Sequence, residues 1–191
     1  PSREQSILSY SGKRIGGIDL DNKLSLMTIM PHFGKNGLLT NGLPVPATFF
    51  TQAVRINDVS AQQDFSSNRT GSELERCCMM STDEKLLRLK HLRDQKLGLR
   101  LSQSAEIAKI SLSAQEQIDL PLAFIEEHFS VPIKRSELAE AIKDELKQFE
   151  LLINESLRQA DTQPEAIFVT GGTAISPVIQ NWIHLKGCLK F

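Results

Sequence analysis

Two glycine pairs, one near each end of the chain, constrain its fold more than any other sequence feature. Gly16-Gly17 precedes a helical pattern that begins near Asp19, and Gly171-Gly172 follows a short apolar run. Glycine has no Cβ, so the backbone at such a turn can adopt positive φ values or approach a bound group closely. Each pair alone is explained more simply by an ordinary turn into a helix, with Asp19 as the cap of the first one. A phosphate contact is the alternative.

The second glycine pair lies between a predicted strand and a predicted helix. Residues 166–169 are apolar, which is typical of a strand that is buried on both faces. Ser176 and Pro177 suit the N-cap and the first position of a helix. The amino end of that helix would present unpaired N–H groups and a partial positive charge, and Gly171 and Gly172 would let a phosphate come close. Phosphate binding is therefore chemically reasonable at this turn.

A polar triplet, Glu106, Lys109 and Ser113, lies on one face of a predicted helix. The three residues follow each other at spacings of three and four, so their side chains stack on successive turns. An apolar stripe on a neighbouring face supports the helix, and its members are Leu101, Ala105, Ala108 and Leu112. From spacing alone, a surface Glu–Lys pair worth roughly 0.2–0.5 kcal/mol is the favoured interpretation. The alternative is a face that presents three polar groups to a sugar and a base.

The remaining elements are predicted from apolar periodicity and from the positions of glycine and proline. We expect, in chain order, a strand at 6–10, a helix from 19 to 30 that ends before Pro31, a loop at 32–47, a short helix within 48–65, an exposed loop at 66–71 and a helical region at 72–113 that breaks near Gly98 or at 81–83. A β-hairpin at 117–133 follows, and then a helix with Ser136 as its N-cap and an apolar stripe to Leu157. The basic residues from Lys85 to Arg100 are interpreted as a solvated helix surface.

The composition is that of an ordinary globular domain and argues against several kinds of partner. A net charge of −1 gives no electrostatic basis for binding nucleic acid or an anionic membrane. No apolar run reaches the ~18 residues that span a bilayer. Cys77, Cys78 and Cys188 fit no disulfide framework, and together with the lack of a signal-peptide pattern they favour a reducing, cytoplasmic location. The cysteines and histidines show no ligand spacing, so no metal site is predicted.

In their order and context, these motifs resemble the nucleotide-binding domain of the Hsp70 family, part of the actin-like ATPase superfamily, and in particular its bacterial YegD-type members. Gly16–Asn22 is similar to the family's Gly-Gly-x-Asp-Phe-Asp-Asn segment, Ala105–Ser113 to its Glu-x-x-Lys-x-x-Leu-Ser helix, and Val169–Pro177 to its adenosine motif. Residues 56–65 look specific to the YegD-type branch. The likeness covers about residues 10–183.

The resemblance implies an α/β fold with α+β elements, corresponding to the second lobe of an actin-like ATPase domain. Residues 1–33 and 161–191 are expected to form parts of an RNase H-like subdomain of IIA type. Residues 34–160 are expected to form helical linkers and an inserted, mostly helical α+β subdomain of IIB type that carries the β-hairpin. The helices near 100–113 and 135–160 would lie at the boundary between the two.

The same resemblance implies roles at a nucleotide site. Glu106 and Lys109 would contact the ribose hydroxyls, and Ser113 would meet the adenine edge. These roles suit the residue types, because a carboxylate accepts from hydroxyls, an ammonium donates and a hydroxyl does either. The turns expected to lie close to the phosphates contain Gly16, Gly17, Gly171, Gly172 and Thr173.

Ile110 and Ile175 depart from the family pattern, in which arginines at both positions sandwich the adenine. The paired change suggests an apolar clamp that lacks the ~0.5–2 kcal/mol of a cation–π contact. Ile110 and Ile175 are therefore included among the expected nucleotide contacts.

The implied parent protein binds ATP or ADP with Mg²⁺ between two lobes and acts as an ATP-dependent chaperone on client proteins. The family's catalytic groups should precede Pro1, so no catalytic residue is assigned in this chain. Whether the parent is an ATPase therefore stays open. The missing first lobe is an expected partner. Two alternatives remain. One is a non-catalytic interaction module with a degenerate nucleotide site, and the other is a sugar-kinase-like member of the superfamily, for which no sugar-binding motif is recognised.

Overall fold

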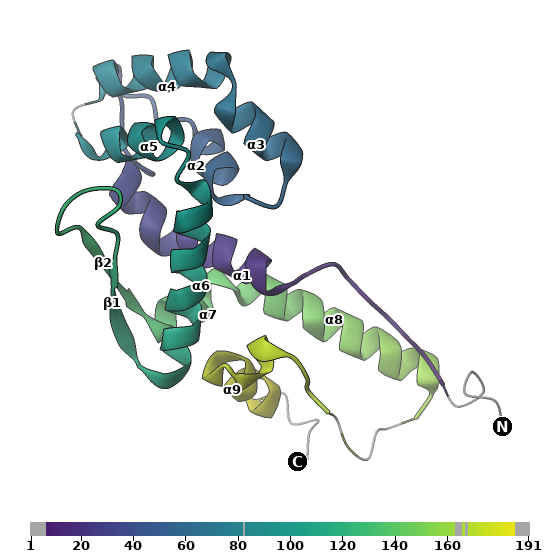
Figure 1. Ribbon diagram of the computed structural model, residues 1–191. Helices are drawn as coiled ribbons and strands as arrows, with labels where there is room; N and C mark the ends of the chain where they lie inside the picture. Colours follow the sequence, from purple (N-terminus) through teal and green to yellow (C-terminus); the bar gives the residue numbers. More distant parts are fainter. Residues whose placement is uncertain (1–6, 82, 163–165, 167, 186–191) are drawn as a thin grey trace.

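The computed structural model describes residues 7–81, 83–162, 166 and 168–185. These residues are mostly helical and include one two-stranded antiparallel sheet (Figure 1). The long helix α6 (Gly98–Ala114) lies near the centre, with the helices of residues 47–94 at one end and both terminal segments at the other. No helix in these ranges is long and apolar enough to cross a bilayer. The expected mixture of α and β structure is confirmed, with helices predominating.

Helix α1 (Gly17–Leu24) continues into a π-helical turn, η2 (Ser25–Ile29), and a 3-10 turn, η3 (Met30–Phe33). The expected end before Pro31 is too early, because a proline is tolerated in the first turn of a helical segment. Gly34 ends the segment with φ +94°, and a Cβ on it would lie 3.2 Å from the backbone nitrogen of Leu86. Both the backbone conformation and the close approach require glycine at this position.

One end of the molecule is formed by helices α2 (Ala47–Val54), α3 (Val59–Ser66), α4 (Asn68–Met80) and α5 (Lys85–Asp94). Asp58 caps α3, since its carboxylate accepts from the amide of Ala61 at 3.1 Å. Ser67 caps α4 in the same way, by accepting from the amide of Thr70 at 3.2 Å. The expected loop at 66–71 is therefore wrong, because Ser67 starts a new helix directly after α3 ends.

The basic residues of α5 are not all solvated, contrary to expectation. The guanidinium of Arg93 donates to the carbonyl oxygens of Phe65 at 2.8 Å and Ser67 at 2.7 Å, and so joins the end of α3 to the start of α4. The guanidinium carbon of Arg88 lies 4.2 Å from the centre of the Phe129 ring. At least these two cations therefore contribute to packing rather than to a solvated face.

Helix α6 leads into the expected hairpin, which is formed by β1 (Gln117–Pro121) and β2 (Ser130–Lys134). Ile118 lies opposite Ile133, and Leu120 lies opposite Val131, so the apolar side chains share the face that packs on the core. The expected break in the helical region 72–113 occurs at both proposed places, because α4 ends at Met80 and α6 begins at Gly98.

The helix expected after the hairpin is in fact two helices, α7 (Arg135–Ala141) and α8 (Lys143–Ala160). The amide of Lys134 donates to Oε2 of Glu137 at 2.8 Å, which places the start before Ser136. The expected N-cap is therefore wrong, and Ser136 lies inside α7. The backbone leaves helical geometry at the buried Ile142, where φ is −100° and ψ is 8°. The buried apolar stripe then ends at Leu146, because α8 extends away from the core (Figure 1).

The expected strands at 6–10 and 166–169 are wrong for the residues of these ranges that the structure describes; Ser6 and Ile167 lie outside them. The amino-terminal segment runs along α8 instead, and the hydroxyl of Ser9 donates to the carbonyl of Ser156 at 2.8 Å (Figure 1). The side chain of Phe168 is 90% exposed rather than buried. A strand needs a hydrogen-bonded neighbour, and neither segment has one among the described residues.

The second glycine turn leads into a 3-10 turn, η4 (Gly172–Ile175), and into α9 (Pro177–Leu185). The predicted start of this helix at Pro177 is confirmed. Val178, Ile179 and Ile183 are buried, and they fix α9 against the rest of the core.

Candidate functional site

Four segments of the chain meet around a cavity of about 230 Å³, here called the smaller cavity. They are α1, the carboxyl-terminal half of α6, α7 with the following Ile142, and η4 with the start of α9. The predicted nucleotide contacts that line it are Gly17, Glu106, Lys109, Ile110, Ser113, Gly172 and Thr173. The polar triplet of α6 therefore faces both glycine turns, which no local sequence pattern required.

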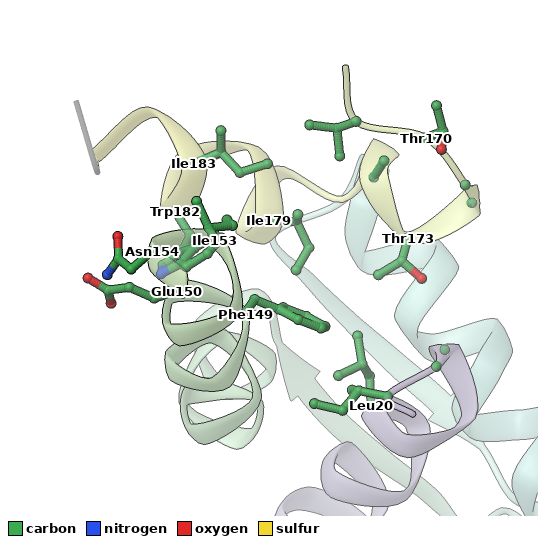
Figure 2. Close-up of a pocket in the computed structure, with 17 residues that line it drawn as sticks. Leu20, Phe149, Glu150, Ile153, Asn154, Thr170, Thr173, Ile179, Trp182 and Ile183 are labelled. Carbon is green, nitrogen blue, oxygen red and sulfur yellow. The ribbon is translucent and has the colours of Figure 1, made fainter. Parts of the chain in front are cut away.

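A larger cavity of about 450 Å³ adjoins the smaller one, and both are lined by Gly17, Leu20, Gly172, Thr173 and Ile179. Gly16 and Gly171, the remaining predicted glycines, line the larger cavity. Its opposite wall is mainly apolar and consists of side chains from α8 and α9, among them Phe149, Ile153, Trp182 and Ile183. Figure 2 shows Phe149 and Ile179 pointing toward the space between α8, α9 and Leu20.

The two isoleucines that were expected to clamp an adenine do not reach the same cavity. Ile110 lines the smaller cavity, and its side chain is 60% exposed. Ile175 is 68% exposed and belongs to neither lining. Of the two isoleucines that were expected to clamp the adenine, Ile110 alone therefore lies at the smaller cavity.

Lys109 turns back toward α1 and forms the central ion pair of the site. Its ammonium nitrogen lies 2.8 Å and 2.9 Å from the two carboxylate oxygens of Asp21, and it also donates to the carbonyl of Gly17 at 3.1 Å. The side chains of Lys109 and Asp21 are only 13% and 6% exposed. Within the described part of the chain no ion pair joins Lys109 to Glu106, so the surface Glu–Lys interpretation is wrong.

Burial is the main influence on the Asp21 carboxyl, and it raises the pKa of this group above its ordinary value. The hydrogen bond and the charge of Lys109 act in the opposite direction, and the negative charge of Glu106 raises the pKa further. Oδ1 of Asp21 is 2.8 Å from the ammonium but has no aligned hydrogen bond, whereas Oδ2 accepts one. Lys109 is therefore the group that keeps a buried carboxylate charged.

The first glycine pair serves close packing and capping. A Cβ on Gly17 would lie 3.2 Å from the ammonium nitrogen of Lys109 and 3.6 Å from Oγ1 of Thr173. The amide of Gly16 donates to a carboxylate oxygen of Asp19 at 2.7 Å, so Asp19 takes part in capping α1, but from inside the helix: Gly16 is the N-cap and α1 starts at Gly17, two residues before the expected start. Glycine at position 17 is thus explained by the approach of α6 and η4.

Alanine substitutions should separate the roles of the second glycine pair. Gly171 has φ +100° and ψ 160°, a region that other residues avoid, so Gly171→Ala should lower the free energy of unfolding by about 1–3 kcal/mol. Gly172→Ala should cost little, because Gly172 lacks a positive φ and no atom lies within 4 Å of the point where its Cβ would stand. Urea denaturation of both variants checks this, and equal losses would contradict the conformational role of Gly171.

Asp21 is the site residue that sequence reasoning missed. It lies in the same segment as the first glycine pair, four residues after Gly17, and that segment was the only available signal. Its partner, Lys109, is 88 residues away, so only the fold reveals the pair. The apolar wall of the larger cavity was missed for the same reason, since Phe149 and Trp182 carry no motif.

The structure gives no sign of a metal centre in the residues that it describes. No group of three or more His, Cys, Asp or Glu side chains gathers there with the geometry to hold an ion. Glu106 is the acidic residue in the described lining of the smaller cavity, and Asp21, which contacts the lining residue Lys109, is already paired with it.

A comparison with protein-family models agrees with the motifs of the site. The family model described as "Hsp70 protein" matches residues 75–186, which is more than half of the 191 residues. The match includes the polar triplet on α6 and the second glycine turn, while the first glycine pair precedes it.

Proposed function

The chain belongs to the Hsp70 family, and we propose that its smaller cavity holds the nucleoside part of ATP or ADP. Hsp70 proteins bind ATP and ADP with Mg²⁺ and bind client proteins. The observation that carries the proposal is the convergence of Gly17, the α6 triplet and Gly172 on one cavity. A cavity formed by an acid, a cation, a hydroxyl and two glycines offers a small set of polar groups that can orient a ligand.

The polar groups of α6 suit a ribose and the edge of a base. The exposed carboxylate of Glu106 can accept from ribose hydroxyls, and the partly buried hydroxyl of Ser113 can donate or accept. Ser113 at present donates to the carbonyl of Lys109 at 3.4 Å, a long contact that a ligand can replace. Ile110 supplies one apolar surface for the base.

The phosphates would lie toward the second glycine turn. Gly172 is exposed, and the space where its Cβ would stand is open, so a bound group can approach the backbone there. Mg²⁺, when bound with the nucleotide, supplies charge neutralisation of the phosphates. The described residues provide no ligand cluster for this ion, and its ligands would come from the phosphates, water and other parts of the parent protein.

Exposed apolar residues support a larger parent in which this chain is part of the second lobe. We infer that residues 1–33 and 161–191 belong to an RNase H-like subdomain and residues 34–160 to a smaller α+β subdomain. Phe168 and Leu151 are largely exposed, and the larger cavity is walled by apolar side chains. Burial of these apolar side chains under further parts of the RNase H-like subdomain would stabilise the lobe. The parent would be a cytoplasmic, YegD-type chaperone that works with its first lobe and with client proteins.

The exposed isoleucines favour one second candidate, a non-catalytic interaction module that keeps the family fold. Ile110 and Ile175 present apolar surface where the resembled family has guanidinium groups. In such a module the cavity would no longer bind nucleotide, and a partner protein would cover the apolar surface.

Calorimetric titration of the chain with ADP separates the two functions. The nucleotide site predicts saturable binding that Glu106→Gln weakens by about tenfold, because hydrogen bonds to a charged carboxylate become weaker bonds to a neutral amide oxygen. Glu75→Gln on α4 is the matched control, since Glu75 is exposed and distant from both cavities. Failure of ADP to bind, or equal effects of the two substitutions, would favour the interaction module.

A further inference from the structure

We propose, building on the function proposed above, that this site recognises the uncharged nucleoside and adds almost no affinity for the polyphosphate. Ligands that share the nucleoside but differ in phosphate number should then bind with similar strength. The proposal rests on three features of the described residues: the charges that line the two cavities, the partner of Lys109, and the group that occupies the amino end of α1.

The first feature is the scarcity of positive charge. Among the described residues, the smaller cavity has one cationic side chain in its lining, Lys109, and the larger cavity has none. Glu106 lies on the same face of α6, and its carboxylate is exposed to the smaller cavity. A polyphosphate carries several negative charges, and it gains affinity where cations or helix amino ends are gathered.

The second feature is that Asp21 already balances the charge of Lys109. The ammonium is 2.8 Å and 2.9 Å from the carboxylate oxygens, and both side chains are largely buried. The carbonyl of Gly17 takes another hydrogen of the ammonium, so few of its three donors remain for a ligand. The charges of Lys109 and Asp21 therefore nearly cancel at the smaller cavity. The carboxylate of Glu106 then gives the lining of this cavity a small net negative charge.

The third feature is that an acidic side chain occupies the amino end of α1. Asp19 lies in the first turn and accepts from the amide of Gly16 at 2.7 Å. Its carboxylate thereby takes the position in which a phosphate would meet the first glycine pair, and it offsets the partial positive charge of the helix.

The second glycine turn adds little charge of its own. The 3-10 turn η4 spans four residues, and two amides are used locally, since Ala174 donates to Gly171 and Ser176 to Thr173, each at 3.1 Å. This turn leaves room for a phosphate, and the amino end of α9 behind it reaches the smaller cavity at Ser176 with a partial positive charge. The exposed carboxylate of Glu106 lies in the same lining and opposes that attraction. The site thus contains polar groups suited to hydroxyls and a base, and its acids repel anions.

Titrations of the 191-residue chain with adenosine, ADP and ATP in the presence of EDTA test the proposal. We expect the three dissociation constants to agree within about threefold and the ADP value to change less than about twofold as salt is raised, because no net charge is neutralised. Binding of ADP more than about tenfold tighter than adenosine would overturn this proposal alone. Failure of all three ligands to bind would overturn the nucleotide function and this proposal with it.

Charge-removing variants make the test sharper. Asp21→Asn should release the charge of Lys109, and Asp19→Asn should free the amino end of α1, so each should shift the ADP-to-adenosine preference toward ADP by about two- to fivefold. Asp19→Asn keeps the proposal testable if Asp21→Asn does not fold, as judged by circular dichroism. Glu75→Gln should leave the preference unchanged. An unchanged preference in Asp19→Asn and in folded Asp21→Asn would contradict the proposal.

Discussion

Replacing Lys109 with methionine is expected to lower the free energy of unfolding by about 3–5 kcal/mol at neutral pH. The variant keeps the length of the side chain but leaves the carboxylate of Asp21 buried without its cation. A buried charge that loses its partner costs more than the pair contributed, because the desolvation of the remaining ion is no longer offset. Urea denaturation at about pH 7.5, followed by circular dichroism, measures the loss.

The loss should shrink as the pH falls, which distinguishes it from simple cavity formation. Burial already raises the pKa of Asp21, and removal of Lys109 deletes the two influences that lower it. The folded variant then binds a proton more tightly than the unfolded chain, so its stability falls as pH rises from the unfolded value of 3.8 through the raised folded value. We expect a smaller deficit at about pH 4.5 than at about pH 7.5.

The matched control is the double variant Lys109→Met with Asp21→Asn, which removes both charges. It should recover part of the stability lost in the single variant at about pH 7.5, and its deficit should depend less on pH. A deficit of Lys109→Met that is the same at both pH values would show that the carboxylate of Asp21 is not held charged by this lysine.

Gly71→Ala is expected to lower the free energy of unfolding by about 2–3 kcal/mol, although alanine is the better helix former. A Cβ at this position would lie 2.6 Å from one terminal nitrogen of Arg93 and 2.8 Å from its guanidinium carbon. The guanidinium cannot move away without releasing its hydrogen bonds to the carbonyls of Phe65, Ser66 and Ser67. Thermal denaturation, supported by urea titration, measures the effect.

A double-mutant cycle identifies Arg93 as the cause. In an Arg93→Ala background the guanidinium is absent, so Gly71→Ala should be neutral or slightly stabilising through its helix propensity. The coupling free energy between positions 71 and 93 should therefore be nearly as large as the loss of stability caused by Gly71→Ala alone. Strictly additive losses would mean that Gly71 is required for a reason other than the approach of Arg93.

Local periodicity predicted the parts of the fold that depend on neighbours in sequence. The spacing of Glu106, Lys109 and Ser113 correctly placed them on one helical face, and the hairpin and the start of α9 at Pro177 were found as expected. A helical stripe and a turn signal are both short-range properties, so a single sequence contains them.

Contacts between distant segments explain what the sequence could not predict. The apolar residues around Phe168 look like a strand, but strand formation depends on a partner that the local pattern does not reveal. By sequence alone, any of several basic residues of α5 could donate hydrogen bonds to the backbone between α3 and α4. The packing of these helices places Arg93 there. The pairing of Asp21 with Lys109 likewise follows from the crossing of α1 and α6.

The location of a bound nucleoside tests the central claim most directly. With methyl-labelled isoleucine, a titration of the chain with adenosine should shift the signals of Ile110, Ile142 and Ile179, which line the smaller cavity, in one saturable process. Ile29 and Ile56 lie outside both linings and should stay unchanged. Unmoved signals from the three cavity isoleucines at saturating adenosine, or shifts only at the distant pair, would contradict a nucleoside site between α1, α6 and η4.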